Sequence, residues 1–196
     1  MAVVSLLHSI STCRIAAQLV ETSSHNKGQP SMGLDGSCPV AQNEPATEQK
    51  DTEMSNITLN QARAIIAGTL AEGHAQGFMP LSVVVLDTGG HITAVEREDN
   101  SANKRFEIAY AKAHGCISIG KGGRWLEMMS ENRPAFIASV AGAFGGALIP
   151  VGGGILVNDS SGATIGAVGI SGDNSDNDEI AGIAGITSAG LVAVVD

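Results

Sequence analysis

The chain has 196 residues, enough for one domain with a buried core or for a domain and a tail. Its formal net charge is −9, from 11 Lys and Arg against 20 Asp and Glu, which argues against nucleic acid or an anionic membrane as a partner. The sequence also lacks the run of about 18 apolar residues that a membrane-spanning helix requires. Aromatic residues make up only 3%, so we expect a core of Val, Ile, Leu and Ala.

The beginning of the chain differs in composition from the rest. Residues 1–20 are moderately apolar but contain a single basic residue, which fits neither a signal peptide nor a transit peptide. Residues 21–55 are rich in Ser, Gly, Pro, Glu, Gln and Asn and show no repeating apolar face, which predicts disorder. Met54 would suit an alternative start. We therefore predict a disordered extension over residues 1–55 and a folded domain over residues 56–196.

The three cysteines are Cys13, Cys38 and Cys116. Their odd number and wide spacing are not typical of a disulfide framework or a zinc site. A reducing compartment is the default for such a pattern, and we expect a cytoplasmic protein.

The first predicted helix begins at Thr58. Thr58 and Gln61 have the spacing of a capping box, in which each side chain satisfies a free backbone N–H of the first turn. Apolar residues then recur at helical spacing from Leu59 to Leu70. Gly77 is the expected end of this helix, with Pro80 beyond it.

Two segments have the pattern of β-hairpins. Residues 81–87 are apolar and β-branched, and residues 91–97 alternate behind a turn of Asp, Thr and two Gly. Residues 154–159 and 163–171 repeat this arrangement around a Ser-Ser-Gly turn. We interpret the two hairpins as halves of one sheet.

Helical patterns lie between the hairpins and after them. The last helix is expected to begin after Ser175, because Ser175 and Asp178 also have capping-box spacing. Strands joined by tight turns run antiparallel, and helices before, between and after them can cover both faces of the sheet. The predicted fold class is therefore α/β of the α+β type, a three-layer sandwich of an antiparallel sheet with helices on both faces. The helices expected between the hairpins cover residues 104–119, 122–129 and 134–140.

Four segments in this order resemble one known family. They are VVVLDTGGHITAVERED, IAYAKAHGCISIGK, PVGGGILV and GAVGISGDNSDNDEIAGIAGI. This set resembles the GlcG/HbpS haem-binding family, which includes the C-terminal domain of PduO-type adenosyltransferases, from Ile57 to about Leu191. The resemblance implies a profilin-like fold, assembly into homo-oligomers and, for some members, binding of haem or iron or degradation of haem.

Three histidines fall in the domain, and haem iron commonly takes an imidazole ligand. His74 lies near the end of the first helix, where the resemblance would place an axial ligand, but it also suits a helix C-terminus electrostatically. His91 follows the hairpin turn and equally suits a solvated position. His114 shares a helix face with Tyr110 and is interpreted as a packed or surface residue rather than a ligand.

Two residues of the middle helix are candidate cofactor-binding or catalytic groups. The resemblance favours Lys112 as the cation that binds a haem propionate, with a solvated lysine as the alternative. Cys116 lies one turn later, where an ammonium could lower its pKa and make it a nucleophile. A buried, inert Cys116 is the alternative that its apolar helix favours.

The densest group of acids lies at the predicted start of the last helix. Asp176 and Glu179 match a D-x-x-E pattern that the resemblance associates with iron, and hard cations prefer carboxylates. Acids in a first helical turn are also stabilising without any metal, and this structural interpretation is the one we favour.

The leading hypothesis is a protein that binds haem as a small-molecule ligand and that degrades haem or binds iron. The alternative is a metabolic enzyme, such as a lyase, isomerase or hydrolase, or an accessory protein encoded in a catabolic or biosynthetic gene cluster. Such an enzyme would use Lys112, Cys116 or Glu179 for acid–base or nucleophilic chemistry. No spacing of residues singles out a catalytic triad or a substrate.

Overall fold

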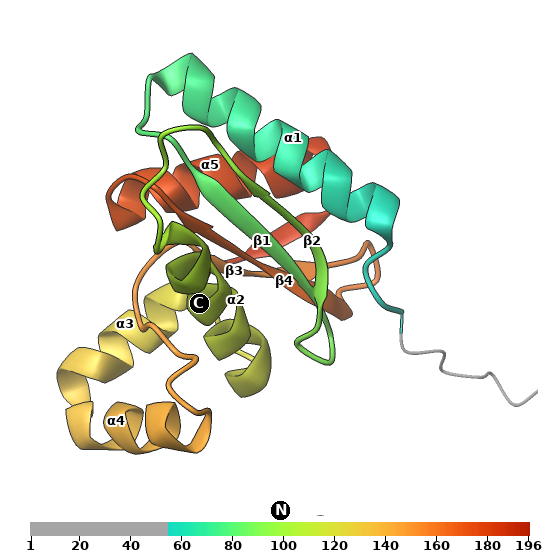
Figure 1. Cartoon of the computed structure of the whole chain (residues 1–196). Helices are drawn as coiled ribbons and strands as arrows, with labels where there is room; N and C mark the ends of the chain where they lie inside the picture. Colours follow the sequence, from blue (N-terminus) through green and yellow to red (C-terminus); the bar gives the residue numbers. More distant parts are fainter. Residues whose placement is uncertain (1–54) are drawn as a thin grey trace, which may run out of the picture. The chain divides into compact units, whose positions relative to one another are not determined.

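The computed structural model describes residues 55–196, so the predictions for the chain before residue 55 lie outside the described part (Figure 1). Five helices and five strands follow one another in that part, and none of these helices is long and apolar enough to cross a membrane. Their bounds are α1 Leu59–Gln76, β1 Ser82–Asp87, β2 Ile92–Arg97, α2 Arg105–Ile119, α3 Gly123–Asn132, α4 Pro134–Ala143, β3 Gly154–Asn158, β4 Thr164–Ser171, α5 Ser175–Ser188 and β5 Val192–Val194.

The five strands form one antiparallel sheet in the order β2-β1-β4-β3-β5. The two predicted hairpins are β1–β2 and β3–β4, and they meet through β1 and β4, with Ser82 opposite Ser171 and Asp87 opposite Gly166. They are therefore halves of one sheet, as expected. The short edge strand β5 was not predicted, because three residues are too few to show a periodic pattern.

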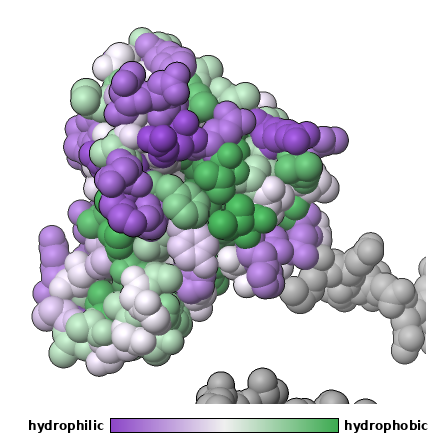
Figure 2. Space-filling view, in the orientation of Figure 1, coloured by the Kyte–Doolittle hydropathy of each residue, from purple (hydrophilic) through white to green (hydrophobic). Residues whose placement is uncertain are grey.

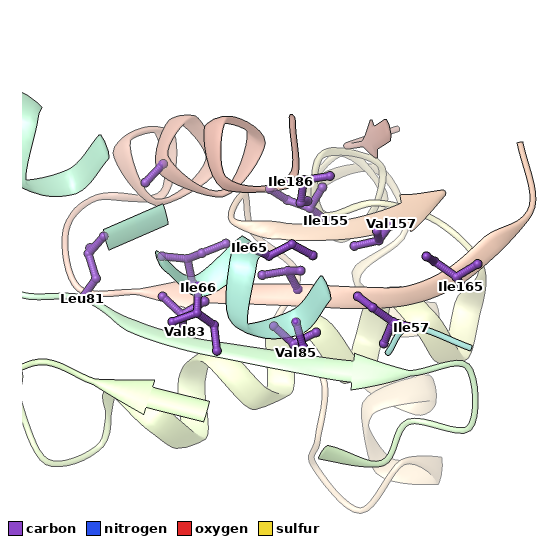
Figure 3. Close-up of a cluster of buried hydrophobic side chains, with 14 residues drawn as sticks. Ile57, Ile65, Ile66, Leu81, Val83, Val85, Ile155, Val157, Ile165 and Ile186 are labelled. Atoms are coloured by element: carbon purple, nitrogen blue, oxygen red, sulfur yellow. The ribbon is translucent and has the colours of Figure 1, made fainter. Parts of the chain in front are cut away.

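The sheet is covered by helices on both faces, which confirms the predicted three-layer α+β architecture. Successive residues of a strand point to opposite faces. Val83 and Val85 accordingly pack with α1 and α5 in one apolar cluster (Figure 3), whereas Val84 and Leu86 pack with α2 in a second cluster. All four side chains are fully buried. Because both faces of β1 are covered, its sequence is an unbroken run of apolar residues from Val83 to Leu86.

The first and last helices share one face of the sheet, where α1 and α5 pack side by side (Figure 1). The start of α1 agrees with the prediction: the Thr58 side chain accepts a hydrogen bond from the Gln61 N–H, and the Gln61 side chain accepts one from the Thr58 N–H. The predicted end also agrees, because Gly77 adopts the left-handed conformation of a C-cap, with φ of 70°.

The start of α5 differs from the prediction by one residue. The N-cap is Asn174, whose side chain accepts a hydrogen bond from the Asn177 N–H, whereas Ser175 is the first residue of the helix. The capping-box assignment of Ser175 and Asp178 was therefore wrong. The reason is that Asp178 is buried, with 1% of its surface exposed, and binds groups on other elements.

The opposite face of the sheet is covered by α2, with α3 and α4 beside it. Contact between α2 and β4 is so close that a Cβ atom added to Gly169 would lie 1.9 Å from the carbonyl oxygen of Ala109. A glycine is thus required where the helix backbone rests on the sheet. This close approach fixes the position of α2, which carries two of the residues that line the candidate site.

Candidate functional site

An open groove lies between the tip of the β1–β2 hairpin and α2. We call it the hairpin groove. Its volume of about 390 Å³ lies within the range of roughly 300–1,000 Å³ typical of small-molecule sites. Figure 2 shows apolar side chains gathered on this face of the molecule, over β2 and the adjoining part of α2, with hydrophilic residues around them. The lining residues are Gly90, His91, Ile92, Phe106 and Tyr110.

A row of rings on α2 forms one wall of the groove and continues beyond it. Phe106, Tyr110 and His114 recur every four residues and therefore share one side of the helix. The ring centroids of Phe106 and Tyr110 are 6.4 Å apart, and those of Tyr110 and His114 are 5.4 Å apart in a stacked arrangement. Phe144 packs edge-on against His114 at 5.9 Å. Side chains in such a row hold one another in place.

His91 lies at the rim of the groove. Its side chain is 82% exposed, and Nδ1 is 3.3 Å from Oδ1 of Asp87. The same carboxylate oxygen accepts hydrogen bonds from the backbone N–H groups of Gly89 and His91, which closes the hairpin turn. Of the two histidines predicted as ligands, His74 and His91, only His91 lines the groove.

His74 lies in a different region. Its imidazole is 71% exposed and pairs with Glu98, whose other carboxylate oxygen accepts a hydrogen bond from the Leu81 N–H at 2.6 Å. Glu98 directly follows β2, whereas His91 directly precedes it, so the length of this strand, roughly 20 Å at about 3.3 Å per residue, separates the two positions. The structure therefore does not bring His74 and His91 into one site.

Lys112 is buried, with 3% of its surface exposed. Its ammonium group donates hydrogen bonds to Oδ2 of Asp178 at 2.8 Å and to the carbonyl oxygen of Ile170 at 2.9 Å. Burial raises the pKa of the Asp178 carboxyl, and the neighbouring ammonium opposes this effect. Gly153, with φ of 85°, lies above the pair, and a Cβ atom there would be 3.0 Å from Nζ. In this arrangement Lys112 links elements of the fold and does not line the groove.

Cys116 is fully buried on the side of α2 that faces the sheet. Burial raises the pKa of its thiol to about 12, an effect that outweighs the opposing charge of Lys112. A thiol with this pKa is protonated at neutral pH, so it is a poor nucleophile. The geometry thus favours the inert alternative considered for this residue.

Asp176 and Glu179 are brought together by Arg124. The guanidinium Nε donates to both oxygens of Glu179, at 2.9 and 3.1 Å, and Nη2 donates to Asp176 at 2.6 Å. These two carboxylates raise the pKa of Arg124. Within residues 55–196, no three His, Cys, Asp or Glu side chains are grouped so that they could hold a metal ion. The two acids bind a guanidinium, as a structural role at the start of α5 would require.

The aromatic lining of the groove was not anticipated from the sequence. The spacing of Phe106, Tyr110 and His114 was a usable signal, since three rings at intervals of four residues are unusual in a chain with 3% aromatic residues. Only the pair of Tyr110 and His114 was recognised. The rest of the groove is formed by His91 and Ile92 at the hairpin tip. Their place in it depends on how the hairpin packs beside α2, and no local sequence pattern predicts that contact.

Together, the sheet topology and the groove define a small α+β domain with an open apolar groove. The family model for the haem-degrading protein HbpS-like family matches residues 57–187, more than half of the chain, and the chain therefore belongs to the HbpS-like family. No protein of curated function matches the chain in a sequence comparison.

Several solved structures have the same fold as this chain. The chain is similar to the PduOC:heme complex, with a TM-score of 0.63, 18% identity, and coverage of 69% of this chain and 96% of the other. It is also similar to Klebsiella pneumoniae protein ORFY, with a TM-score of 0.64, 20% identity, and coverage of 74% and 98%. For HbpS the TM-score is 0.60, with 22% identity and coverage of 72% and 96%. Identities this low establish the shared fold alone.

Proposed function

We propose that this protein binds haem in the hairpin groove. The observation that carries the proposal is the groove itself: an open, apolar, ring-lined depression with an imidazole at its rim, in a chain of the HbpS-like family. One solved structure with the same fold is a complex with haem. A porphyrin is a large, flat, mostly apolar molecule, and its iron commonly takes an imidazole ligand.

The residues present fit such a ligand. Phe106, Tyr110 and Ile92 offer apolar and aromatic surface against which a flat ring system can pack. Half of the Ile92 surface is exposed to solvent. Exposed apolar side chains that gather in one patch often mark a binding site. His91 brings a nitrogen ligand to the same place. Neither Lys112 nor His74, the other two residues predicted to bind the cofactor, lines this groove.

Bound haem would supply an iron centre for oxygen chemistry. We therefore extend the proposal from haem binding to haem degradation. The groove is open, so a bound porphyrin would remain accessible to a reductant and to oxygen. Degradation would appear as a steady loss of Soret absorbance when both are supplied, and storage or transport would leave the absorbance constant.

Titration of the full-length protein with haemin tests the proposal. We expect a saturable shift of the Soret band in the wild type and weaker binding in Phe106→Ala, which removes one wall of the groove. Met79→Ala is the control, because Met79 is a large exposed apolar side chain outside the groove lining. The proposal is abandoned if the wild type gives no saturable shift, or if both variants weaken binding equally.

We also propose that the protein is a cytoplasmic homo-oligomer. Met128 and Phe136 on α3 and α4 are large apolar side chains with 46% and 38% of their surface exposed, and contact between subunits would cover them. The free thiol of Cys116 suits a reducing compartment. Light scattering coupled to size exclusion would measure the mass in solution, and a monomeric mass would contradict the assembly.

A further inference from the structure

One side of α4 is fully exposed. In Figure 1, α4 lies beyond α3, away from the sheet, and α3 is the element with which it mainly packs. The residue of α4 that is buried is Ile137. The residues at i, i+3, i+4 and i+7 on the side opposite Ile137 are all exposed, and we call this surface the α4 face. It consists of Ala135, Ala138, Ser139 and Gly142.

The α4 face offers neither a charge nor a free side-chain donor to water. Its single hydroxyl, Oγ of Ser139, donates a hydrogen bond to the carbonyl oxygen of Ala135 at 2.9 Å. No charged residue occurs between positions 134 and 158, whereas the exposed side of a surface helix normally carries charged and polar groups. A Cβ atom added to Gly142 would meet no atom within 4 Å. Within residues 55–196, therefore, nothing covers this face.

The two ends of α4 lack the charges that usually stabilise a helix. Its first turn has no acidic residue and no side-chain cap, and its last turn has no basic residue. A cation lies at the wrong end instead: the guanidinium of Arg133 is next to the N-terminus, 4.9 Å from the centroid of the Phe136 ring. Because a helix N-terminus is partly positive and a C-terminus partly negative, Arg133 would be better placed at the C-terminus of a second helix.

We propose that α4 packs antiparallel against α4 of a second copy of this chain, across a two-fold axis near Ala138 and Ser139. This inference rests on the homo-oligomer proposed above and names its contact surface. In an antiparallel pair, Arg133 of each subunit lies beside the last turn of the other helix, so each helix supplies the charge that the other lacks. A two-fold interface joins the same patch of both subunits, and small side chains let two helices approach closely.

Other surfaces and other partners fit these observations less well. The exposed apolar side chain Ile180 lies on α5, but α5 packs on both α1 and the sheet. The first turn of α5 also contains Asp176 and Asp178, so the charge of that helix end is already matched. A lipid surface is a poor partner for the α4 face, because a chain with a net charge of −9 is repelled by anionic headgroups.

Two substitutions in the full-length protein test the α4 face by light scattering coupled to size exclusion. Ala138→Glu places two like charges across the two-fold axis, and we expect the dissociation constant of the assembly to rise about tenfold or more. Ala67→Glu is the matched control, because Ala67 is an exposed alanine on α1, and it should keep the wild-type mass.

Arg133→Glu separates an interface from a role within the subunit. A carboxylate at the N-terminus of α4 suits its own helix, so the subunit should unfold at the same or a higher urea concentration. Beside the last turn of the other helix the same carboxylate is unfavourable, so the assembly should weaken, by about tenfold for the two symmetric contacts. A role confined to the subunit would not move the two readouts in opposite directions.

Cross-linking tests the position of the two-fold axis. In a background of Cys13→Ser and Cys38→Ser, Ser139→Cys should form a disulfide-linked dimer on mild oxidation, because two copies of a residue beside the axis face each other. Ala64→Cys, at another exposed helical position, is the control and should remain unlinked.

The possible failures are distinguishable. A monomeric wild type overturns the proposed homo-oligomer and this inference with it, and leaves the α4 face for a different partner. An oligomeric wild type whose mass is unchanged in Ala138→Glu overturns only the assignment of the α4 face. Equal dissociation by Ala138→Glu and Ala67→Glu, or equal cross-linking through Ser139→Cys and Ala64→Cys, has the same consequence. Circular dichroism checks that each variant is folded.

Discussion

The ammonium group of Lys112 and the carboxylate of Asp178 form an ion pair of 2.8 Å in the interior, with 3% and 1% of the two side chains exposed. The two residues are 66 positions apart, on α2 and α5. The remaining bonds of the pair go to the backbone, from Nζ to the Ile170 carbonyl and from the Asp173 N–H to Asp178. The pair thus ties the helix that carries the groove to the helix on the other side of the sheet.

Removing one member of this pair should destabilise the protein strongly. Lys112→Met leaves the Asp178 carboxylate buried without its partner, for which the expected loss is about 3–5 kcal/mol in the free energy of unfolding. The double variant Lys112→Met, Asp178→Leu should recover much of that loss, since no buried charge remains. Urea unfolding of both variants measures the two values. Asp176→Asn is the control: its pair with Arg124 is exposed, and it should lose less than about 1 kcal/mol.

The close approach of α2 and β4 makes a second prediction. In Gly169→Ala, the new methyl group would overlap the Ala109 carbonyl oxygen, so the helix and the sheet must separate, and we expect a loss of about 1–3 kcal/mol or more. Gly142→Ala is the matched substitution on α4, where the methyl group would meet no atom within 4 Å. There we expect a gain of up to about 1 kcal/mol from helix propensity. Equal effects in thermal denaturation would contradict the described packing.

The thiol of Cys116 should be unreactive in the native protein. Its pKa is raised to about 12, because burial disfavours the thiolate, so almost none of the reactive form exists at pH 8. In a variant with Cys13→Ser and Cys38→Ser, iodoacetamide should leave the folded protein unlabelled and label it fully in urea. Mass spectrometry distinguishes the two products. Rapid labelling of the folded protein would show that Cys116 is accessible.

Asp173 should contribute to acid denaturation. Its pKa is lowered, first by the hydrogen bond from the Met79 N–H and then by that from the Asn174 N–H. A carboxyl whose native pKa is depressed stabilises the fold above its unfolded pKa, here 3.8, and loses that contribution as the pH falls towards the native value. Asp173→Asn should therefore be less stable than the wild type at pH 6, with a difference that shrinks below pH 4. Unfolding curves that run parallel from pH 6 to pH 3 would disprove this role.

Local features of the sequence determined the secondary structure and the pairing within each hairpin. The Thr58 capping box, the Gly77 stop and the two turns act over a few residues, so their consequences can be read without knowing the rest of the chain. The apolar run of β1 also predicted a strand buried on both faces, because each successive side chain needs an apolar environment. From these elements the three-layer α+β class followed.

Only the tertiary structure decided which side chains share a site. Lys112 lies one turn before Cys116 on α2. Its charge is nevertheless neutralised by Asp178 on α5, 66 residues away. His74 and His91 looked equivalent as ligand candidates, but they lie at opposite ends of β2. The imidazole of His114 is hydrogen-bonded to the carbonyl of Ala147, 33 residues away. Contacts of this range depend on how helices pack on a sheet, and hydrophobic burial, which drives that packing, is non-directional and does not specify which distant side chains meet.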